Sequence, residues 1–532
     1  MSHGVYDEAY TSGRISLDST QAGDNITWSK YVGVDAGGTT CPNASDNSGR
    51  ALVSVSTFNV LWLKTTCTSG TFTSDGVDYT SSDANQTINL DDATLTGTLT
   101  FNMKNCILNG RLYPVGVKAS QKQYRNLVFD NVTINPLDGY GAMTTNANAA
   151  VTFTNCRLTA TSATSPADAF FSFGSAANAS LGLMKFANCT FTVTGNTSSP
   201  KSLIKIYNVS TTGNLIVTGC TLTNTYSTVE VLPITSSAVS VILDNNTLTT
   251  DTTGSSADTY GVHIGGDTDT TSYSLGVVRV QNNTIYQKGT GSGASVIMGI
   301  GPECVGAEIS YNKILGQDYW NPTLGGADGK GLGVYLRGCA NVSFHHNAVW
   351  SRGALVNVMA DGMKATQNTF RSDHGSSTNG ATVFIRDQNT TGVTDTKNVV
   401  FTHNILQAGA STDYVFSIAP HAGGMDVSGW IVDRNVYFKT GTTSASNSLY
   451  LVSGAGAFTG LPAFWTAQGG VSVSNDASSV FADPQLTASL TIPIGSSAKG
   501  SQVPASASPA TWNDWGAFSR KAGGGGSGGI RR

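Results

Sequence analysis

Three carboxylates between residues 300 and 390 are the side chains of this chain best suited to acid–base chemistry. Glu303, Asp361 and Asp387 each lie at or just past the end of a short segment of alternating apolar and polar residues. If those segments are stacked strands, Glu303 and Asp361 share a column at roughly 10 Å, and Asp361 and Asp387 approach to about 5 Å. Carboxylate pairs at about 5 Å and about 6.5–9.5 Å are what retaining and inverting glycoside hydrolysis require. These three residues are the predicted catalytic candidates.

Arginine and aromatic side chains accompany the carboxylates. Outward positions of the alternating segments are predicted to include His263, Tyr335, Asn357 and Phe384, and a second outward row holds Arg337 and Arg386. A guanidinium could neutralise a uronate or act as the base of a lyase, and aromatic rings could stack on sugars. The predicted substrate-binding residues are Arg337, Arg386, Tyr335, His263 and Trp320. The alternative is that all of these groups are solvated strand ends with Arg and Asp paired on the surface. A structural role is expected for His345 and His346, at a strand–turn junction.

A repeat of strand, sharp turn and strand must position these residues. Twelve copies run from Met103 to Tyr437, spaced by 21 to 37 residues and by about 30 on average. One turn position is often Asn, the residue type other than Gly that best tolerates a left-handed backbone; its members are Asn105, Asn131, Asn155, Asn188, Asn245 and Asn282. The next position is Cys or Val in five copies (Cys106, Val132, Cys156, Cys189, Cys220) and then Asn in seven (Asn246, Asn283, Asn312, Asn347, Asn368, Asn404, Asn435).

Seven amides at one structural position predict a stacked hydrogen-bonded ladder, with one strand spacing of about 4.8 Å between members. A third strand lies between copies, for example around Val262, Val334 and Val383. The predicted fold is therefore all-β, a single-stranded right-handed parallel β-helix of about 12 coils. The expected organisation is an N-terminal cap or anchoring region (1–85), the β-helix (86–445), a C-terminal closing segment (446–520) and a flexible Gly-rich tail (521–532).

Through this repeat, the chain resembles the pectin-lyase-like β-helix superfamily over roughly residues 98 to 520. Residues 480–486 and 514–518 resemble the closing segment common in bacterial and phage β-helix repeat proteins. The architecture hosts lyases, hydrolases and non-catalytic fibres, so the resemblance is specific for the fold and not for an activity. Similarity to phage β-helix proteins implies a homotrimer, although no coiled-coil heptads support one.

Composition excludes several classes of function. Charged residues make up 12% of the chain and the net charge is −4 without a basic run, so no nucleic acid partner is expected. No apolar stretch approaches about 20 residues, so no membrane insertion is expected. No CxxC or HExxH pattern occurs, which predicts no metal site and no cofactor. Four cysteines fall in the inward column, and Cys304 and Cys339 are expected to stack on adjacent coils, as free thiols rather than a disulfide. The sequence leaves the redox state of Cys41, Cys67, Cys304 and Cys339 open.

These observations lead to one expected function and two alternatives. No secretory signal is visible at the start of the sequence, which fits a phage virion protein made in the cytoplasm and released by lysis, and fits equally a mature exported protein whose signal has been removed. We expect a tail fibre, tailspike or capsid appendage that contacts host surface polysaccharide and other virion proteins, with degradation of the polysaccharide left open. The alternatives are a secreted polysaccharide lyase or glycoside hydrolase, and a purely structural spike.

Overall fold

The structure is a computed structural model, and it describes the following parts of the chain. These are residues 15–17, 25–29, 51–55, 61–63, 70–81, 86–89, 99–113, 125–136, 143–145, 149–161, 169–173, 182–195, 201–207, 213–232, 239–253, 259–266, 275–289, 295–316, 330–358, 361–372, 381–386, 396–409, 414–419, 427, 429–441, 450–452, 456–458, 478–486 and 490. The predicted Gly-rich tail, Cys41, Cys67, Trp320 and Asp387 lie outside them.

The described residues form strands and turns and contain no helix, as the scarcity of strong helix formers predicts. The strands belong to three long sheets, and every third strand in chain order belongs to the same sheet. Sheet A contains β1 (Ile15–Leu17), β4 (Leu61–Leu63), β7 (Gln86–Asn89), β10 (Arg111–Tyr113), β13 (Met143–Thr145), β16 (Ala169–Phe173), β19 (Ser202–Tyr207), β22 (Val229–Leu232), β25 (Thr259–Ile264), β28 (Ser295–Ile300), β31 (Lys330–Arg337), β34 (Gly353–Val358), β37 (Val383–Arg386), β40 (Phe416–Ala419), β43 (Tyr450–Val452) and β44 (Gly456–Phe458). Sheet B contains β2 (Asn25–Ser29), β5 (Gly70–Asp75), β8 (Leu99–Lys104), β11 (Arg125–Asp130), β14 (Ala149–Thr154), β17 (Leu183–Ala187), β20 (Gly213–Thr218), β23 (Val239–Asp244), β26 (Val278–Gln281), β29 (Glu308–Ser310), β32 (Ser343–His345), β35 (Lys364–Thr366), β38 (Val400–Thr402) and β41 (Ile431–Asp433). Sheet C contains β3 (Ala51–Val55), β6 (Val77–Ser81), β9 (Ile107–Asn109), β12 (Thr133–Asn135), β15 (Arg157–Ala160), β18 (Thr190–Val193), β21 (Thr221–Asn224), β24 (Thr247–Asp251), β27 (Thr284–Lys288), β30 (Lys313–Leu315), β33 (Ala348–Ser351), β36 (Thr369–Ser372), β39 (Ile405–Ala408), β42 (Val436–Lys439) and β45 (Val480–Phe481).

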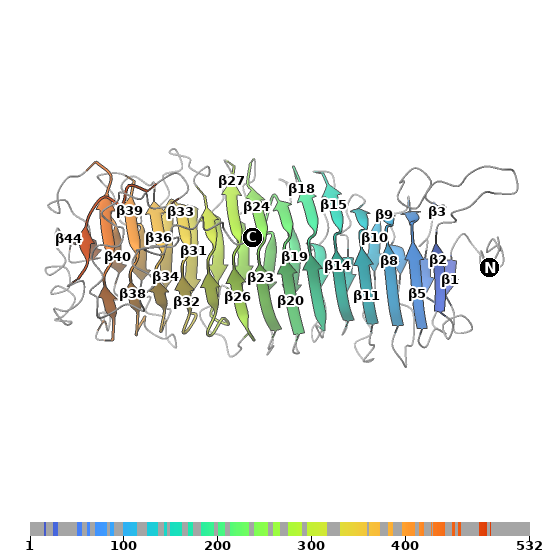
Figure 1. Cartoon of the computed structure of the whole chain (residues 1–532), viewed down its shortest axis with the longest axis horizontal. Helices are drawn as coiled ribbons and strands as arrows, with labels where there is room; N and C mark the ends of the chain where they lie inside the picture. Colours follow the sequence, from blue (N-terminus) through green and yellow to red (C-terminus); the bar gives the residue numbers. More distant parts are fainter. Residues whose placement is uncertain are drawn as a thin grey trace, which may run out of the picture. The chain divides into compact units, whose positions relative to one another are not determined.

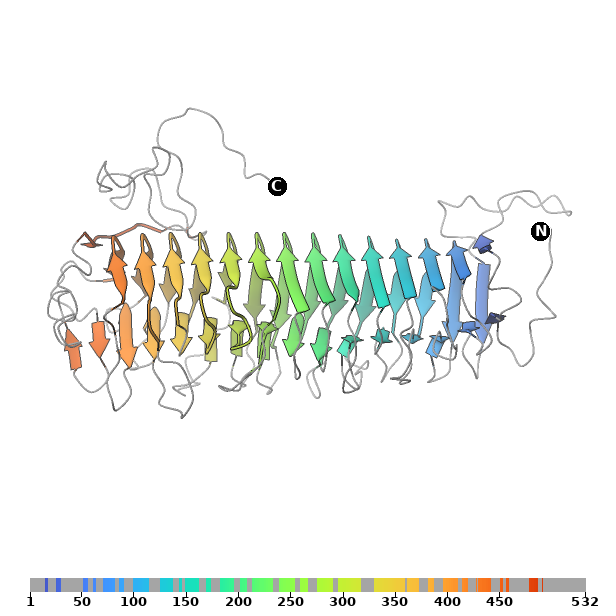
Figure 2. The ribbon, with the colours of Figure 1, turned by 90° about the horizontal axis from the view of Figure 1, so that it is seen from below.

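Two compact units divide the chain. Unit 1 comprises residues 1–266, 272–279 and 288–292, and unit 2 comprises residues 267–271, 280–287 and 293–532. In unit 1, the strands of sheet B from β5 to β23 lie side by side and pair in parallel (Figure 1). Unit 2 repeats this stacking, and its yellow to orange strands lie in succession in Figure 2. Apart from the antiparallel pair of β43 and β44, the described pairings are parallel. This all-β architecture is consistent with a parallel β-helix.

In-register pairing stacks identical side chains in the core of unit 1. Phe153 on β14 pairs with Phe129 on β11 and with Phe186 on β17, and all three side chains are fully buried. Their ring centroids are 4.6 Å and 5.1 Å apart, and both pairs are stacked. The alternation of buried and partly exposed residues along these strands follows from the period of two in a strand, which sends every second side chain inward.

A two-residue turn joins sheet B to sheet C. Its first residue has a left-handed backbone, for example Asn155 with φ of 54°, and its second points inward, as buried Cys156 does. Cys106, Cys189 and Cys220 occupy the equivalent inward place as buried free thiols, which confirms the predicted inward column. Cys304 and Cys339, elsewhere in unit 2, are also buried free thiols.

The predicted amide ladder is confirmed in unit 2. Each member before the last, Asn435, uses its backbone N–H and its side-chain Nδ2 to donate to the Oδ1 of the next, at 2.9–3.0 Å and 2.9–3.2 Å respectively. The members are Asn283, Asn312, Asn347, Asn368, Asn404 and Asn435. In unit 1, the Oδ1 of Asn246 accepts the backbone N–H of Cys220 at 2.9 Å, so one amide also stacks on the cysteine column there.

The predicted outward position of Asn357 is wrong. Asn357 pairs with Leu336 on one side and Ile385 on the other, and all three side chains are buried. The outward row is one residue away and contains Tyr335 and Phe384. Asn357 instead donates from Nδ2 to the sulfur of Met363 at 3.4 Å, which gives this buried amide a weak acceptor.

Candidate functional site

Two of the predicted arginines lie in one row at the end of sheet A in unit 2. Arg337, the last residue of β31, pairs with Val358, and Val358 pairs in turn with Arg386, the last residue of β37. The two arginines are therefore two strand spacings apart, roughly 10 Å. Arg386 is exposed and Arg337 is half-buried. A row of guanidinium groups at this spacing could bind successive anionic or hydroxyl groups of an extended ligand.

An aromatic cluster adjoins the arginine row on the same face. Half-buried Tyr335 packs against the buried pair of Ala381 and Phe384, as Leu332 and Tyr414 also do. Tyr335 precedes Arg337 by two residues on β31, so both side chains leave the same side of the strand. Rings that are wedged between apolar neighbours hold their orientation, and a ring face beside a guanidinium is a suitable surface for a sugar. We call Tyr335, Tyr414, Arg337 and Arg386 the sheet A face.

Glu303 and Asp361, two of the three predicted carboxylates, are not level with each other in the way the sequence suggested. Glu303 is only 2% exposed, in the turn after β28, whereas Asp361 is half-buried and its Oδ1 accepts Asn398 Nδ2 at 3.0 Å. Glu303 comes three residues before Gly306, and Asp361 comes one residue before Gly362. These two glycines hold equivalent places in their turns, with φ of 70° and 69°.

Hydrogen bonds fix that alignment. Gly306 N–H donates to Ala340 O, Asn341 N–H donates to Asp361 O, and Gly362 N–H donates to Lys397 O. Asp361 is therefore level with Ala340 and not with Glu303, so the predicted shared column of Glu303 and Asp361 is wrong. The physical reason is that turns leaving sheet A differ in length, which shifts every residue inside them. The predicted approach of Asp361 to Asp387 involves a residue outside those described and stays a prediction.

His263 lies in unit 1, in a row of ionisable side chains that was not predicted from the sequence. On sheet A, Lys205 pairs with Glu230 and Glu230 pairs with His263. Lys205 Nζ is 3.4 Å from Glu230 Oε2, which also accepts the Ser202 hydroxyl at 2.5 Å. Glu230 and His263 are 7% and 4% exposed, and the His263 ring stacks on Tyr260 with centroids 4.0 Å apart. The alternation Val229-Glu230-Val231 places Glu230 outward and was the available signal.

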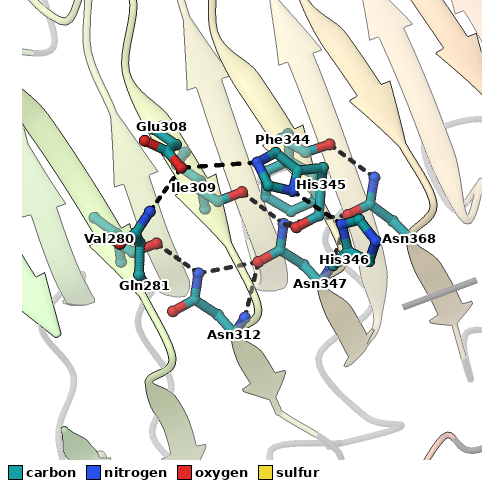
Figure 3. Close-up of polar contacts among 10 residues, drawn as sticks. All are labelled: Val280, Gln281, Glu308, Ile309, Asn312, Phe344, His345, His346, Asn347 and Asn368. Carbon is teal, nitrogen blue, oxygen red and sulfur yellow. Dashed lines mark hydrogen bonds and ion pairs between the residues drawn. The ribbon is translucent and has the colours of Figure 1, made fainter. Parts of the chain in front are cut away.

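A second polar cluster occupies the end of sheet B in unit 2 (Figure 3). Glu308 Oε1 accepts Gln281 Nε2 at 2.6 Å and lies 3.8 Å from His345 Nε2. His345 Nδ1 and His346 Nδ1 are 3.0 Å apart, a hydrogen bond in which one ring donates to the other. The Tyr311 ring stacks on His346 with centroids 4.8 Å apart. These contacts hold both rings in place at the strand–turn junction, and the structural role expected for the two histidines stays a prediction.

Both histidines of this cluster have depressed pKa values. Burial lowers the pKa of His346, the charge of His345 adds to the effect, and together they bring it to about 4. Burial also lowers the pKa of His345, and the negative charge of Glu308 partly opposes this. The paired rings are therefore neutral near pH 7, which allows the N–H···N hydrogen bond between them.

We expect the stability of the protein to fall as the pH falls from about 6.5 to about 4, with His346 contributing. The unfolded chain protonates this ring near pH 6.5, while the folded chain protonates it only near 4, so proton uptake between these values favours unfolding. His346→Gln should flatten this part of a plot of melting temperature against pH. An unchanged slope in the variant would contradict the role of His346, and His263→Gln in unit 1 provides the matched control.

Among the described residues, no group of three or more His, Cys, Asp or Glu side chains is placed to hold a metal ion. A search of the same residues found no helix long and apolar enough to cross a membrane. Comparison of the chain with protein-family models, with curated proteins and with solved structures found no match. The function is therefore inferred from the side chains of the sites described above and from their geometry.

Proposed function

We propose that this protein binds an extended polysaccharide on a host cell surface, as a surface component of a phage virion such as a tail fibre, tailspike or capsid appendage. The observation that carries the proposal is the sheet A face, where the ring of Tyr335 adjoins the row formed by Arg337 and Arg386. Side chains of successive strands recur at about 4.8 Å, so such a face presents repeated contacts to a repeated polymer. Rigid strands also keep those contacts in place before the ligand binds.

We also propose that the fold is a right-handed β-helix of about 12 coils with an N-terminal cap or anchor, a closing segment and a Gly-rich tail. We propose that the protein assembles as a homotrimer. The inner amide ladder supports the coiled arrangement, because it requires one Asn per turn in register. At its far end, Asn435 N–H donates to the Ser479 hydroxyl at 2.9 Å, and β45 pairs with β42. These contacts support a closing role for the segment that contains Ser479.

The double substitution Arg337→Ala/Arg386→Ala is expected to weaken polysaccharide binding by about tenfold or more, because charge-assisted hydrogen bonds from two guanidinium groups are lost. The measurement is binding to an array of bacterial capsular polysaccharides and lipopolysaccharides. Arg157→Ala/Arg279→Ala removes the same charge from exposed positions of unit 1 and should leave binding unchanged.

The outcomes of this comparison separate the alternatives. Equal loss in both double variants would mean that net charge alone drives binding, which would contradict the proposed site. Mass analysis of each bound polysaccharide after incubation shows whether it is shortened. Shortened products that persist in Asp361→Asn would exclude that carboxylate from catalysis. Products with an unsaturated end would indicate a lyase, and saturated ends would indicate a hydrolase.

A further inference from the structure

One turn position carries different residue types in the two units. Among the described residues, the first residue of the turn between sheets B and C has a left-handed backbone, with φ between 50° and 71°. In unit 1 this position is occupied by Gly76, Asn105, Asn131, Asn155, Asn188, Gly219 and Asn245. In unit 2, after Asn282, it is occupied by Tyr311, His346, Gln367, His403 and Arg434, which we call the turn row.

Hydrogen bonds show that the turn row is a true row of stacked residues. The backbone N–H groups of Tyr311, His346, Gln367 and His403 each donate to the carbonyl of the last residue of the next sheet B strand, as Tyr311 does to His345 O and His346 does to Thr366 O. The same pattern holds in unit 1, where Asn131 N–H donates to Thr154 O. Since successive members are one strand spacing apart, the turn row extends over roughly 20 Å.

Asn suits this position in unit 1 for a clear physical reason. Asn tolerates the left-handed backbone, and its amide can bond to its neighbours along the row. Asn131 Nδ2 donates to Asn105 Oδ1 at 2.8 Å, and Asn155 Nδ2 donates to Asp130 Oδ1 at 3.3 Å. Unit 1 therefore has an outer row made mostly of amides and an inner column made mostly of cysteines.

Unit 2 reverses this arrangement. Its amides occupy the inner position, where Asn347 Nδ2 donates to Ile309 O at 2.8 Å and Asn368 Nδ2 donates to Phe344 O at 2.9 Å (Figure 3). The inner ladder thus holds each turn from inside the coil. That support permits outer residues that do not themselves favour the turn conformation.

The residue types of the turn row are not explained by local conformation. A left-handed backbone is unfavourable for Tyr, Gln and Arg, which have neither the flexibility of Gly nor the short amide of Asn. Unfavourable backbone conformations that persist in a structure cluster at functional sites. Tyr311, Gln367 and Arg434 all keep such a conformation in a unit whose other turns show that Asn fits.

The side chains of the turn row present chemistry suited to sugars. Tyr311 is 42% exposed and stacks on His346, while Gln367, His403 and Arg434 are half-buried. The adjoining strand ends add further donors and acceptors, namely His345, Thr366, Thr402 and Asp433. Arg434 Nε lies 3.8 Å from Asp433 Oδ2, so a guanidinium is already oriented at one end.

We infer that the turn row is a second polysaccharide-binding surface, on a different side of unit 2 from the sheet A face, that takes an extended chain lying along the row. Planar polar groups bind sugar hydroxyls, the Tyr311 ring stacks on a sugar face, and the Arg434 guanidinium binds a hydroxyl or carboxylate of the same chain. The inference shares only the class of ligand with the proposed function, and it depends on different residues.

The test is the triple substitution Tyr311→Asn/Gln367→Asn/Arg434→Asn, which installs the residue that unit 1 uses. Because Asn suits the turn, the variant should melt at the same temperature as the wild type or above it. Its binding to at least one polysaccharide of the array of capsular polysaccharides and lipopolysaccharides should weaken by about tenfold or more. The reverse exchange in unit 1, Asn131→Tyr/Asn155→Gln/Asn245→Arg, should lower the melting temperature and leave binding unchanged.

Each outcome supports or overturns the inference. Unchanged binding of the triple variant across the array, or a lowered melting temperature, would overturn it. If the triple variant loses binding while Arg337→Ala/Arg386→Ala keeps it, the turn row stands and the sheet A face fails. The opposite result leaves the sheet A face and removes the turn row. A wild type that binds no member of the array would overturn both.

Discussion

Replacing Asn347 by alanine is expected to lower the free energy of unfolding by about 3–5 kcal/mol, since several buried polar groups lose their partners at once. Asn347 Oδ1 accepts the backbone N–H and the Nδ2 of Asn312 at 3.0 and 2.9 Å. Its Nδ2 donates to Ile309 O, to His345 O and to Asn368 Oδ1 at 2.8, 3.0 and 3.1 Å (Figure 3). Denaturant unfolding at equilibrium, followed by circular dichroism, measures the change.

The control for Asn347 is the exposed amide of Asn155 in the turn of unit 1. Asn155→Ala introduces a less tolerant residue at φ of 54° but removes no buried hydrogen bond, so its effect should be about 1 kcal/mol. Asn347→Asp keeps an acceptor but places a charge among carbonyl oxygens, and it should destabilise at least as much as Asn347→Ala. If Asn347→Ala were no worse than Asn155→Ala, the inner ladder would not be a main source of stability in unit 2.

Phe153→Ala should also destabilise the protein by about 3–5 kcal/mol, because it leaves a cavity in the aromatic stack of unit 1. Phe153 is fully buried and lies between Phe129 and Phe186, with stacked ring centroids 4.6 and 5.1 Å away. It also meets Phe171 edge to face at 5.2 Å. Its neighbours belong to strands of two sheets that hold their own backbone bonds, so they can move only partly into the space.

Two further substitutions separate the aromatic contribution from burial. Phe153→Leu keeps most of the apolar volume and should cost about 1–1.5 kcal/mol. Thr152→Ala changes the adjacent outward residue and should stay within about 0.5 kcal/mol of the wild type. The same denaturant experiment applies to all three. Equal effects of Phe153→Ala and Phe153→Leu would show that the cavity is filled by relaxation and that the stack adds little.

The turn between sheets B and C was predictable from the sequence in detail. It has two residues in every copy, so counting along the chain preserves which residue is left-handed and which points inward. Asn283, Asn312 and Asn347 could therefore be aligned without coordinates, and the ladder they form was predicted correctly. The inward cysteine column was predicted for the same reason.

The candidate site was less predictable because it depends on turns of variable length. The different places of Glu303 and Asp361 relative to Gly306 and Gly362 shifted the carboxylates out of the expected column. Because side chains alternate with a period of two along a strand, an error of one residue was enough to predict Asn357 as outward when it points inward. The contact of Lys205 with Glu230 joins residues of different coils and could not be counted along the chain.

The sequence by itself determined the repeated strand–turn–strand unit, the inner ladder and the parallel β architecture. Each depends on a short sequence pattern, and because the turn has a constant length, the residues of that pattern keep the same structural positions from one copy to the next. The tertiary structure alone decided which outward side chains meet. Those meetings depend on the register between strands separated by variable loops, and register is fixed by backbone hydrogen bonding and core packing over the whole stack. The different residue types in the Asn row of unit 1 and the turn row of unit 2 could be interpreted only from the backbone conformation, which is left-handed in both rows.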